Sequence, residues 1–139
     1  MNIDSIENGY VIDHIKAGFG MKIYEYLNLG ELDCQVALIK NARSNKLEKK
    51  DIIKIDRKID LNFGILAYID PNITVNVIEH GKRIKKFHPE LEEILENIVK
   101  CKNPRCITAS ERNLKQIAVL TDKENIVYRC KYCESIVKA

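Results

Sequence analysis

Two short stretches near the C-terminus decide how this chain folds there: Cys101-Lys102-Asn103-Pro104-Arg105-Cys106 and Cys130-Lys131-Tyr132-Cys133. Each stretch presents two thiols from one short loop, and four sulfurs at about 2.3 Å satisfy the tetrahedral preference of Zn²⁺. A site closed by four sulfurs leaves no position for water or substrate, so the ion is expected to be structural rather than catalytic. The predicted ligands of one zinc ion per chain are Cys101, Cys106, Cys130 and Cys133.

Two other uses of paired cysteines fit the sequence less well. The first residues, Met1–Asp4, lack the basic start and apolar run of a signal peptide, so we expect a reducing, cytoplasmic location in which disulfides do not persist. A redox C-x2-C motif is expected near a βαβ unit, whereas Cys130 and Cys133 lie close to the C-terminus. The fifth cysteine, Cys34, lies in a strand-like run and is predicted to be a small core residue.

Length and charge limit the function classes. The 139 residues suffice for one ordinary domain or two small ones, and a cysteine-rich tail that needs a metal to fold favours two. We place these domains at residues 1–90 and 91–139. The formal charge of +3 falls to about +1 once four thiolates and one Zn²⁺ are counted, which gives nucleic-acid binding little support. No apolar stretch approaches the roughly 18 residues of a membrane span, so no membrane partner is expected.

Residues 1–88 alternate between strand-like and helix-like patterns. Strands are predicted at 9–15, 34–39, 50–59, 73–78 and 82–87, a loop at 41–48, and helices at 19–27 and 60–68. Gly30 is placed as the C-cap of the first helix and Asp60 as the N-cap of the second. This β-α-β-β-α-β order with one more strand predicts an α+β fold, a ferredoxin-like antiparallel sheet with two helices followed by a small zinc-ribbon-like β domain. Residues 90–100 are interpreted as the connector between the domains.

Charged residues on the predicted strands point to a polyphosphate site. Lys50 and Lys54 are an even number of residues apart on one strand, so their ammonium groups face the same way. Lys86 lies on the last strand, and Asp13 and His14 lie on the first. If these strands are neighbours, the lysines and His14 surround a polyphosphate, and Asp13 accepts hydrogen bonds from ribose hydroxyls. A lysine-rich strand face is more often only solvated, and the sequence contains no glycine-rich phosphate loop.

Four segments that together span almost the whole chain follow the order of a known family. They are Val11–Ile15, Lys50–Ile55, Pro71–Asn76 and the cysteine-containing tail Cys101–Glu134. Together they resemble the regulatory chain of aspartate carbamoyltransferase. The resemblance implies a non-catalytic subunit in pyrimidine biosynthesis, with an N-terminal nucleotide-effector domain and a C-terminal zinc domain that contacts the catalytic chain. It also implies regulatory dimers that link catalytic trimers, and CTP, ATP and UTP as effectors.

The resemblance assigns site residues one by one. The implied effector contacts are Asp13, His14, Lys50, Lys54, Asn76 and Lys86, with Ile6, Val11 and Ile78 nearby, and the implied zinc ligands are the four cysteines already identified. Asn76 is expected to read a base edge. The chain departs from the family at Lys102, where a proline is usual, and at Gly81 and Arg83, where bulkier or apolar groups often surround the base. The preference of this chain between CTP and ATP therefore stays open.

Two other function classes compete with this interpretation. A zinc-ribbon nucleic-acid-binding protein would use the basic residues around the cysteines, which are Lys100, Lys102, Arg105, Arg112, Lys115, Arg129 and Lys131. Only Tyr128 and Tyr132 can stack on bases there, and the same basic residues suit an acidic protein partner. A small ferredoxin-like hydrolase fails because His14, His80 and His88 lie in no recognisable nucleophile motif.

Overall fold

The structure, a computed structural model, describes residues 6–43, 49–61 and 63–138. It divides into two compact units, Met1–Pro89 and Glu90–Ala139. Each unit contains one antiparallel β-sheet. Among the helices of the described ranges, none is long and apolar enough to cross a membrane.

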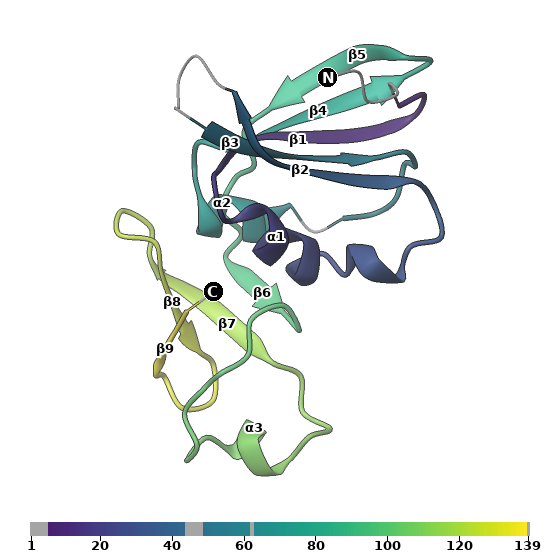
Figure 1. The fold of residues 1–139 in the computed structure, drawn as a ribbon. Helices are drawn as coiled ribbons and strands as arrows, with labels where there is room; N and C mark the ends of the chain where they lie inside the picture. Colours follow the sequence, from purple (N-terminus) through teal and green to yellow (C-terminus); the bar gives the residue numbers. More distant parts are fainter. Residues whose placement is uncertain (1–5, 44–48, 62, 139) are drawn as a thin grey trace. The chain divides into compact units, whose positions relative to one another are not determined.

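The first unit is a five-stranded sheet with the strand order β2-β3-β1-β4-β5. Its elements are β1 (Gly9–Lys16), α1 (Gly20–Tyr26), the 3₁₀ turn η1 (Leu29–Glu31), β2 (Val36–Arg43), β3 (Lys49–Ile55), α2 (Gly64–Ile69), β4 (Thr74–Glu79) and β5 (Lys82–Phe87). Figure 1 shows α1 and α2 on the same side of this sheet. The order β2-β3-β1-β4 is that of a ferredoxin-like fold with β5 added at one edge, so the predicted fold class is confirmed.

The core of this unit lies between the sheet and the two helices. Ile12, Ile53 and Val75 on the three central strands are fully buried in one cluster that also contains Ile23 of α1 and Leu66 of α2. Because side chains alternate along a strand, the neighbours of these residues lie on the opposite face. We call that opposite face, lined by residues such as Val11, Lys54 and Asn76, the outer face.

Strand boundaries differ from the sequence-based prediction in two places. β2 begins at Val36 and continues to Arg43, so residues 41–43 are strand rather than loop, and residues 44–48 of the predicted loop lie outside the described residues. β3 ends at Ile55 instead of continuing to Ile59. Just beyond this end, the Asp56 carboxylate accepts the Glu7 N–H at 3.1 Å.

Both predicted helix caps are wrong. The first helix ends with Leu27 as its C-cap, and Gly30 lies inside η1, which adds a short turn before β2. The second helix begins at Gly64 with Phe63 as its N-cap, so Asp60 precedes it without capping it. Glycine has a low helix propensity, and at the first residue of a helix that cost is smaller than in the middle, where the prediction had placed Gly64.

The second unit is a four-stranded sheet with the order β6-β7-β8-β9. Its elements are β6 (Ile94–Glu96), α3 (Ile107–Ser110), β7 (Ile117–Asp122), β8 (Val127–Cys130) and β9 (Ile136–Val137). The interpretation of residues 90–100 as a connector is wrong, because β6 is an edge strand of this sheet. Leu95 is fully buried opposite Ala118 of β7, so burial of this apolar side chain draws the segment into the second unit.

Candidate metal centre and outer-face site

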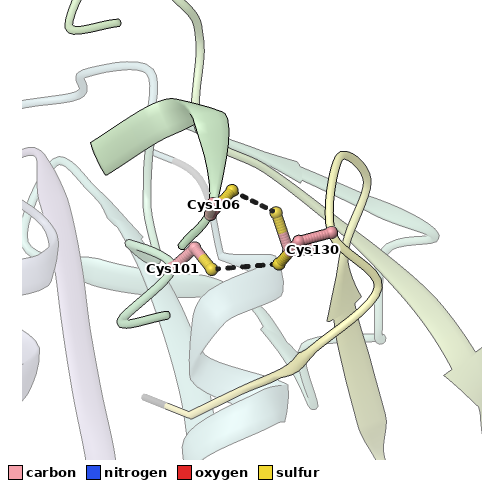
Figure 2. Close-up of side chains that lie close together, drawn as sticks. Cys101, Cys106 and Cys130 are labelled. Carbon is pink, nitrogen blue, oxygen red and sulfur yellow. Dashed lines mark hydrogen bonds between the residues drawn. The ribbon is translucent and has the colours of Figure 1, made fainter. Parts of the chain in front are cut away.

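The four cysteines of the second unit form one compact cluster. Their sulfur atoms all lie within 4.8 Å of one another, and the cluster contains Cys101, Cys106, Cys130 and Cys133. Cys101 Sγ lies 3.6 Å from Cys133 Sγ, and Cys106 Sγ lies 3.7 Å from Cys130 Sγ (Figure 2). A tetrahedron with metal–sulfur bonds of about 2.3 Å has sulfur–sulfur edges of about 3.8 Å. The cluster therefore has the size of a four-sulfur metal site.

Local hydrogen bonds shape the two loops that carry these thiols. In the first loop, Asn103 accepts the Cys106 N–H at 3.0 Å with its carbonyl oxygen. In the second loop, the Glu134 N–H donates to the Cys130 carbonyl at 2.9 Å, and Glu134 adopts a left-handed φ of 62°. These tight turns bring each pair of sulfurs to one side of its loop. Asn103 also donates to the Ser135 hydroxyl at 3.1 Å, which ties the two loops together.

The surroundings of the four thiols raise the pKa of two of them and lower the pKa of the other two. Burial raises the pKa of Cys101 to about 12 and also raises the pKa of Cys130. A hydrogen bond from the Ser135 side chain lowers the pKa of Cys133 to about 6, and one from Thr108 lowers the pKa of Cys106. A metal binds thiolates, so an incoming cation displaces the protons that burial retains on the first two sulfurs.

Four of the predicted effector contacts lie in one row across the outer face of the first unit. Val11 on β1 is directly opposite Lys54 on β3 and Asn76 on β4. Lys86 on β5 is the next residue in the row, directly opposite Asn76. Side chains of directly opposite residues lie on the same face of a sheet, so these four side chains share one surface.

Asp13, His14 and Lys50 lie together beside that row. The β1–β3 register shifts between Ile12 and Ile15, so Asp13 and His14 form a β-bulge, and His14 has a left-handed φ of 58°. The Lys50 ammonium lies 2.9 Å from Asp13 Oδ1, and the same oxygen accepts the His14 N–H at 2.6 Å. The bulge therefore presents an ion pair and an imidazole at one end of the row.

Asn76 contributes a polar atom without a partner. Asn76 is 9% exposed, and its Nδ2 donates to the Val11 carbonyl at 3.4 Å. Its Oδ1 is buried and has no hydrogen-bond partner within the described part of the chain. A buried acceptor left unpaired costs about 1–3 kcal/mol, so this position favours a ligand that brings a hydrogen-bond donor.

The remaining predicted site residues occupy positions around the row. Ile78 lies two residues beyond Asn76 on β4, opposite both Gly9 and Arg83. Ile6 precedes β1 and is buried at 8% exposure. Gly81, one of the three positions at which the chain departs from the family, lies in the β4–β5 turn with a φ of 75° and open space where a side chain would stand.

Sequence reasoning missed two hydroxyl residues that hold site groups in place. Thr74 is 3% exposed, and its Oγ1 lies 2.8 Å from His14 Nδ1. Thr108 is 7% exposed and donates to Cys106 Sγ at 3.1 Å. The sequence carries a signal only for Thr108, which is two residues from a predicted ligand. Thr74 and His14 are far apart in sequence, and only the β1–β4 pairing brings them together.

Comparison with known proteins identifies the family of this chain. The sequence matches the family models of the aspartate carbamoyltransferase regulatory chain, its allosteric domain over residues 1–90 and its metal binding domain over residues 93–139. It is 52% identical over 136 residues to the regulatory chain of Clostridium botulinum (strain Hall), covering 98% of this chain and 93% of that relative. It is 50% identical over 139 residues to that of Clostridium tetani (99% and 96% covered), and 39% identical over 138 residues to that of Bifidobacterium longum (99% of each).

The fold, the cysteine cluster and these matches define a class of protein: a non-catalytic regulatory subunit that combines an allosteric domain with a metal-binding domain. The chain belongs to the family of aspartate carbamoyltransferase regulatory chains, and its cellular role is in pyrimidine biosynthesis. Its second unit provides a four-cysteine cluster able to hold a metal ion.

Proposed function

We propose that this chain binds nucleoside triphosphates on the outer face of its first unit and passes their effect to the catalytic chains of aspartate carbamoyltransferase. The observation that carries the proposal is the row Lys54, Val11, Asn76 and Lys86, with Asp13, His14 and Lys50 at its end. None of these polar side chains belongs to the buried core between sheet and helices. Their chemistry is that of a nucleotide site.

The dimensions of the row suit a nucleotide. Lys54 and Lys86 are separated by three strand spacings, about 14 Å at roughly 4.8 Å per strand. Two ammonium groups at that separation, with apolar Val11 between them, leave room for a base and ribose as well as phosphates. The unpaired Asn76 oxygen can accept from the exocyclic amino group of cytosine or adenine. CTP and ATP are therefore the proposed effectors, with UTP as a third nucleotide that reinforces CTP.

We propose zinc as the metal, one ion per chain in a structural role. Four sulfurs and no oxygen or nitrogen ligand are the donor set that Zn²⁺ takes in closed tetrahedral sites. The ion would hold Cys101–Cys106 against Cys130–Cys133 and so join the two loops. All four positions are filled by the chain's own thiolates, and the ion supplies folding free energy without taking part in a reaction.

We propose that the metal-binding unit forms the contact with the catalytic chain. Ile107 is 51% exposed and Tyr132 is 37% exposed, and each is adjacent in sequence to a cysteine of the cluster. Large apolar side chains exposed beside rigid loops, with basic residues around them, suit an acidic protein surface. Loss of the metal would disorder the loops that carry these side chains and would release the partner.

We also propose that the isolated chain forms a regulatory dimer, and that the complete assembly works in the cytoplasm. The two edges of the five-stranded sheet differ in charge. β5 carries Lys82, Arg83, Lys85 and Lys86, and cationic side chains oppose edge-to-edge pairing. β2 instead carries half-buried apolar residues along Val36–Ile39, so β2 is the edge better suited to a second copy. A mass measurement on the isolated chain tests this.

Two observations count against the nucleic-acid alternative. Tyr128, one of the two rings near the cysteines, is fully buried and cannot stack on a base. Arg129 donates to the Glu134 carbonyl at 3.0 Å, so part of the basic cluster is used within the fold.

The decisive experiment uses the complex of this chain with its catalytic subunit. Nucleotide affinity is measured by calorimetry with and without a bisubstrate inhibitor in the active site, and substrate affinity is measured with and without nucleotide. We expect each ligand to change the other's affinity by the same factor, typically about 5- to 150-fold. If CTP, ATP and UTP neither bind the complex nor alter substrate affinity, the effector proposal is wrong. The isolated chain should show no carbamoyl-transfer activity.

A further inference from the structure

Asp51 is a buried carboxylate that the effector site does not use directly. It lies on β3 with 0% exposure, and its side chain is on the helix face of the sheet, opposite to that of Lys50. Its Oδ2 accepts the backbone N–H groups of Gly18 at 3.1 Å and Gly20 at 2.9 Å, and its Oδ1 accepts that of Asn41 at 3.1 Å. Within the described residues, no cationic side chain forms an ion pair with it.

The three amides belong to the segments on either side of β3. The pairing of β3 with each neighbouring strand is interrupted near Asp51. The β1–β3 register shifts between Ile12 and Ile15, and the β2–β3 register shifts between Ile39 and Ala42. Asn41, inside the second shift, has a left-handed φ of 59°. The Asp51 carboxylate therefore binds β2 within its bulge and binds the chain just beyond the end of β1.

A bulge holds one extra residue, and it persists only if the strand is fixed on both sides of that residue. On one side of the β1 bulge, Ile12 pairs with Ile53 in the regular ladder. On the other side, Ile15 pairs with Asp51 itself, and the Asp51 carboxylate holds Gly18 and Gly20. Without these two hydrogen bonds, only the Ile15–Asp51 and Lys16–Lys50 pairs hold the end of β1. A shift toward a register without the bulge then becomes easier, and it would turn Asp13 and His14 away from Lys50.

We propose that Asp51 is a positioning residue for the effector site: its carboxylate fixes the β1 bulge and thereby sets Asp13 and His14 against Lys50. The ion pair between Lys50 and Asp13, at 2.9 Å, joins the residue next to Asp51 in sequence to the bulge that Asp51 stabilises. This inference rests on the proposed nucleotide function of the outer face, and it adds a residue on the opposite side of the sheet that does not touch the ligand.

Gly20 offers a second way to disturb the same carboxylate. A Cβ at Gly20 would lie 2.8 Å from Asp51 Oδ2 and 3.0 Å from Asp51 Cβ. The first distance is shorter than real Cβ contacts and the second is tighter than most of them, so a side chain at position 20 displaces the carboxylate without removing it. The same Cβ would lie 2.8 Å from Leu38 Cδ1, so this variant also presses on the core. Gly20→Ala is therefore an independent test of the same inference.

The experiment measures CTP and ATP affinity by calorimetry on the full chain in complex with its catalytic subunit. Asp51→Asn keeps the size of the side chain but places an amide N–H₂ against one of the backbone donors. We expect about a tenfold loss of affinity for Asp51→Asn and a smaller loss for Gly20→Ala. Ile55→Val, at a fully buried core position of the same strand, is the control, and it should lower the melting temperature without changing nucleotide affinity.

A double-mutant cycle separates positioning from general destabilisation. If Asp51 acts through the bulge, Asp51→Asn should weaken nucleotide binding by a smaller factor in a His14→Ala background than in the parent, because one of the two groups it positions is already absent. The inference is wrong if Asp51→Asn and Gly20→Ala both keep the nucleotide affinity of the parent. It is also wrong if Asp51→Asn lowers that affinity by as large a factor in the His14→Ala background as in the parent. Neither result bears on the effector site itself. Absence of nucleotide binding in the parent complex overturns the proposed function, and this inference with it.

Discussion

The two units of this chain are stabilised by different means. The first has one continuous cluster of buried apolar residues, including Ile12, Ile53 and Leu66, between a sheet and two helices. In the second, two of the buried residues are the metal-cluster cysteines Cys106 and Cys130, and the last strand, β9, is only two residues long. A unit of this size seldom has a sufficient apolar core, so we expect its fold to depend on a bound metal, whereas the first unit is held by packing.

The difference extends to how each site is built. We expect a metal bound by the four cysteines to hold the second unit together, so that a change at any of these cysteines costs the unit its fold. The polar residues of the outer face, such as Lys54 and Lys86, lie outside the buried core cluster and can change with little effect on packing. The comparison therefore predicts large structural effects in the second unit and binding effects without unfolding in the first.

The largest expected effect comes from removing one metal ligand. Cys130→Ser should abolish metal binding and cost the second unit on the order of 10 kcal/mol of metal-coupled folding free energy. Hydrogen exchange should show fast exchange from about Cys101 onward, and slow exchange should persist in β1, β3 and β4. Metal analysis of the purified parent should give one Zn²⁺ per chain.

Cys34→Ser is the matched control for that experiment. Cys34 packs against the core of the first unit and lies outside the cluster, so this variant should keep its metal and an ordered second unit. A Cys130→Ser chain that is metal-free but still protected from exchange in β7 and β8 would show that the second unit folds by packing alone. The comparison between the two units would then be wrong.

The next effect is the pH dependence of metal binding. Burial raises the pKa of Cys101 to about 12 and also raises the pKa of Cys130, so both thiols carry protons at neutral pH before a metal arrives. Binding requires thiolates, and metal affinity is therefore high at high pH and lost as the pH falls. Each proton released adds about one log unit of affinity per pH unit, so these two thiols alone give a slope of at least about two near neutrality.

A competition titration with a chromophoric chelator over a range of pH measures this slope. Hydrogen exchange in the first unit, followed over the same range, serves as the internal control, because the four cysteines of the cluster all lie in the second unit. A metal affinity that does not change with pH would mean that all four sulfurs are already thiolates in the free chain. That result would contradict the division of the thiols into two kinds.

Smaller effects are expected from single lysines on the outer face. Lys54→Ala and Lys86→Ala should each weaken CTP and ATP binding by about 1.5–3 kcal/mol, the range for hydrogen bonds to charged groups, with no change in melting temperature. Lys115→Ala, which removes the surface partner of Glu96 in the second unit, should leave nucleotide affinity unchanged. Calorimetric titration of the three variants decides between a specific site and general attraction, because equal losses would indicate only net charge.

The fold was predictable from sequence where one kind of pattern dominated. Alternation along β3 placed Ile53 and Ile55 on one face and Lys50 and Lys54 on the other, and the structure has the same arrangement. The cysteine spacing identified all members of the cluster before any geometry was known. Both signals are local, because strand alternation and short loops depend on residues only a few positions apart.

What sequence reasoning missed depends on contacts between distant segments. β6 was interpreted as a connector, because nothing within residues 90–100 shows that Leu95 is buried opposite Ala118. Two hydrogen bonds arise only when strands pair: one between His14 and Thr74, and one from the Asn41 N–H to the Asp51 carboxylate. The β-bulges at these positions leave no sequence pattern. Residue types at the outer-face site were predictable, but their partners were not.

The smallest expected effect is on metal affinity, from the loss of one hydrogen bond to a cysteine of the second unit. Thr108 donates to Cys106 Sγ at 3.1 Å, and this hydrogen bond lowers the pKa of Cys106. Thr108→Val keeps the shape and removes the donor, so the thiolate loses a stabilising partner and metal affinity should fall by about 10- to 100-fold. Ser110→Ala, on the same short helix, removes a hydroxyl that bonds only the Ile107 carbonyl and should keep parent affinity. Parent affinity in both variants would mean that the four thiolates alone set the strength of the site. A loss in Thr108→Val with an unchanged first unit, by contrast, would show that even single hydrogen bonds in the second unit act through the metal.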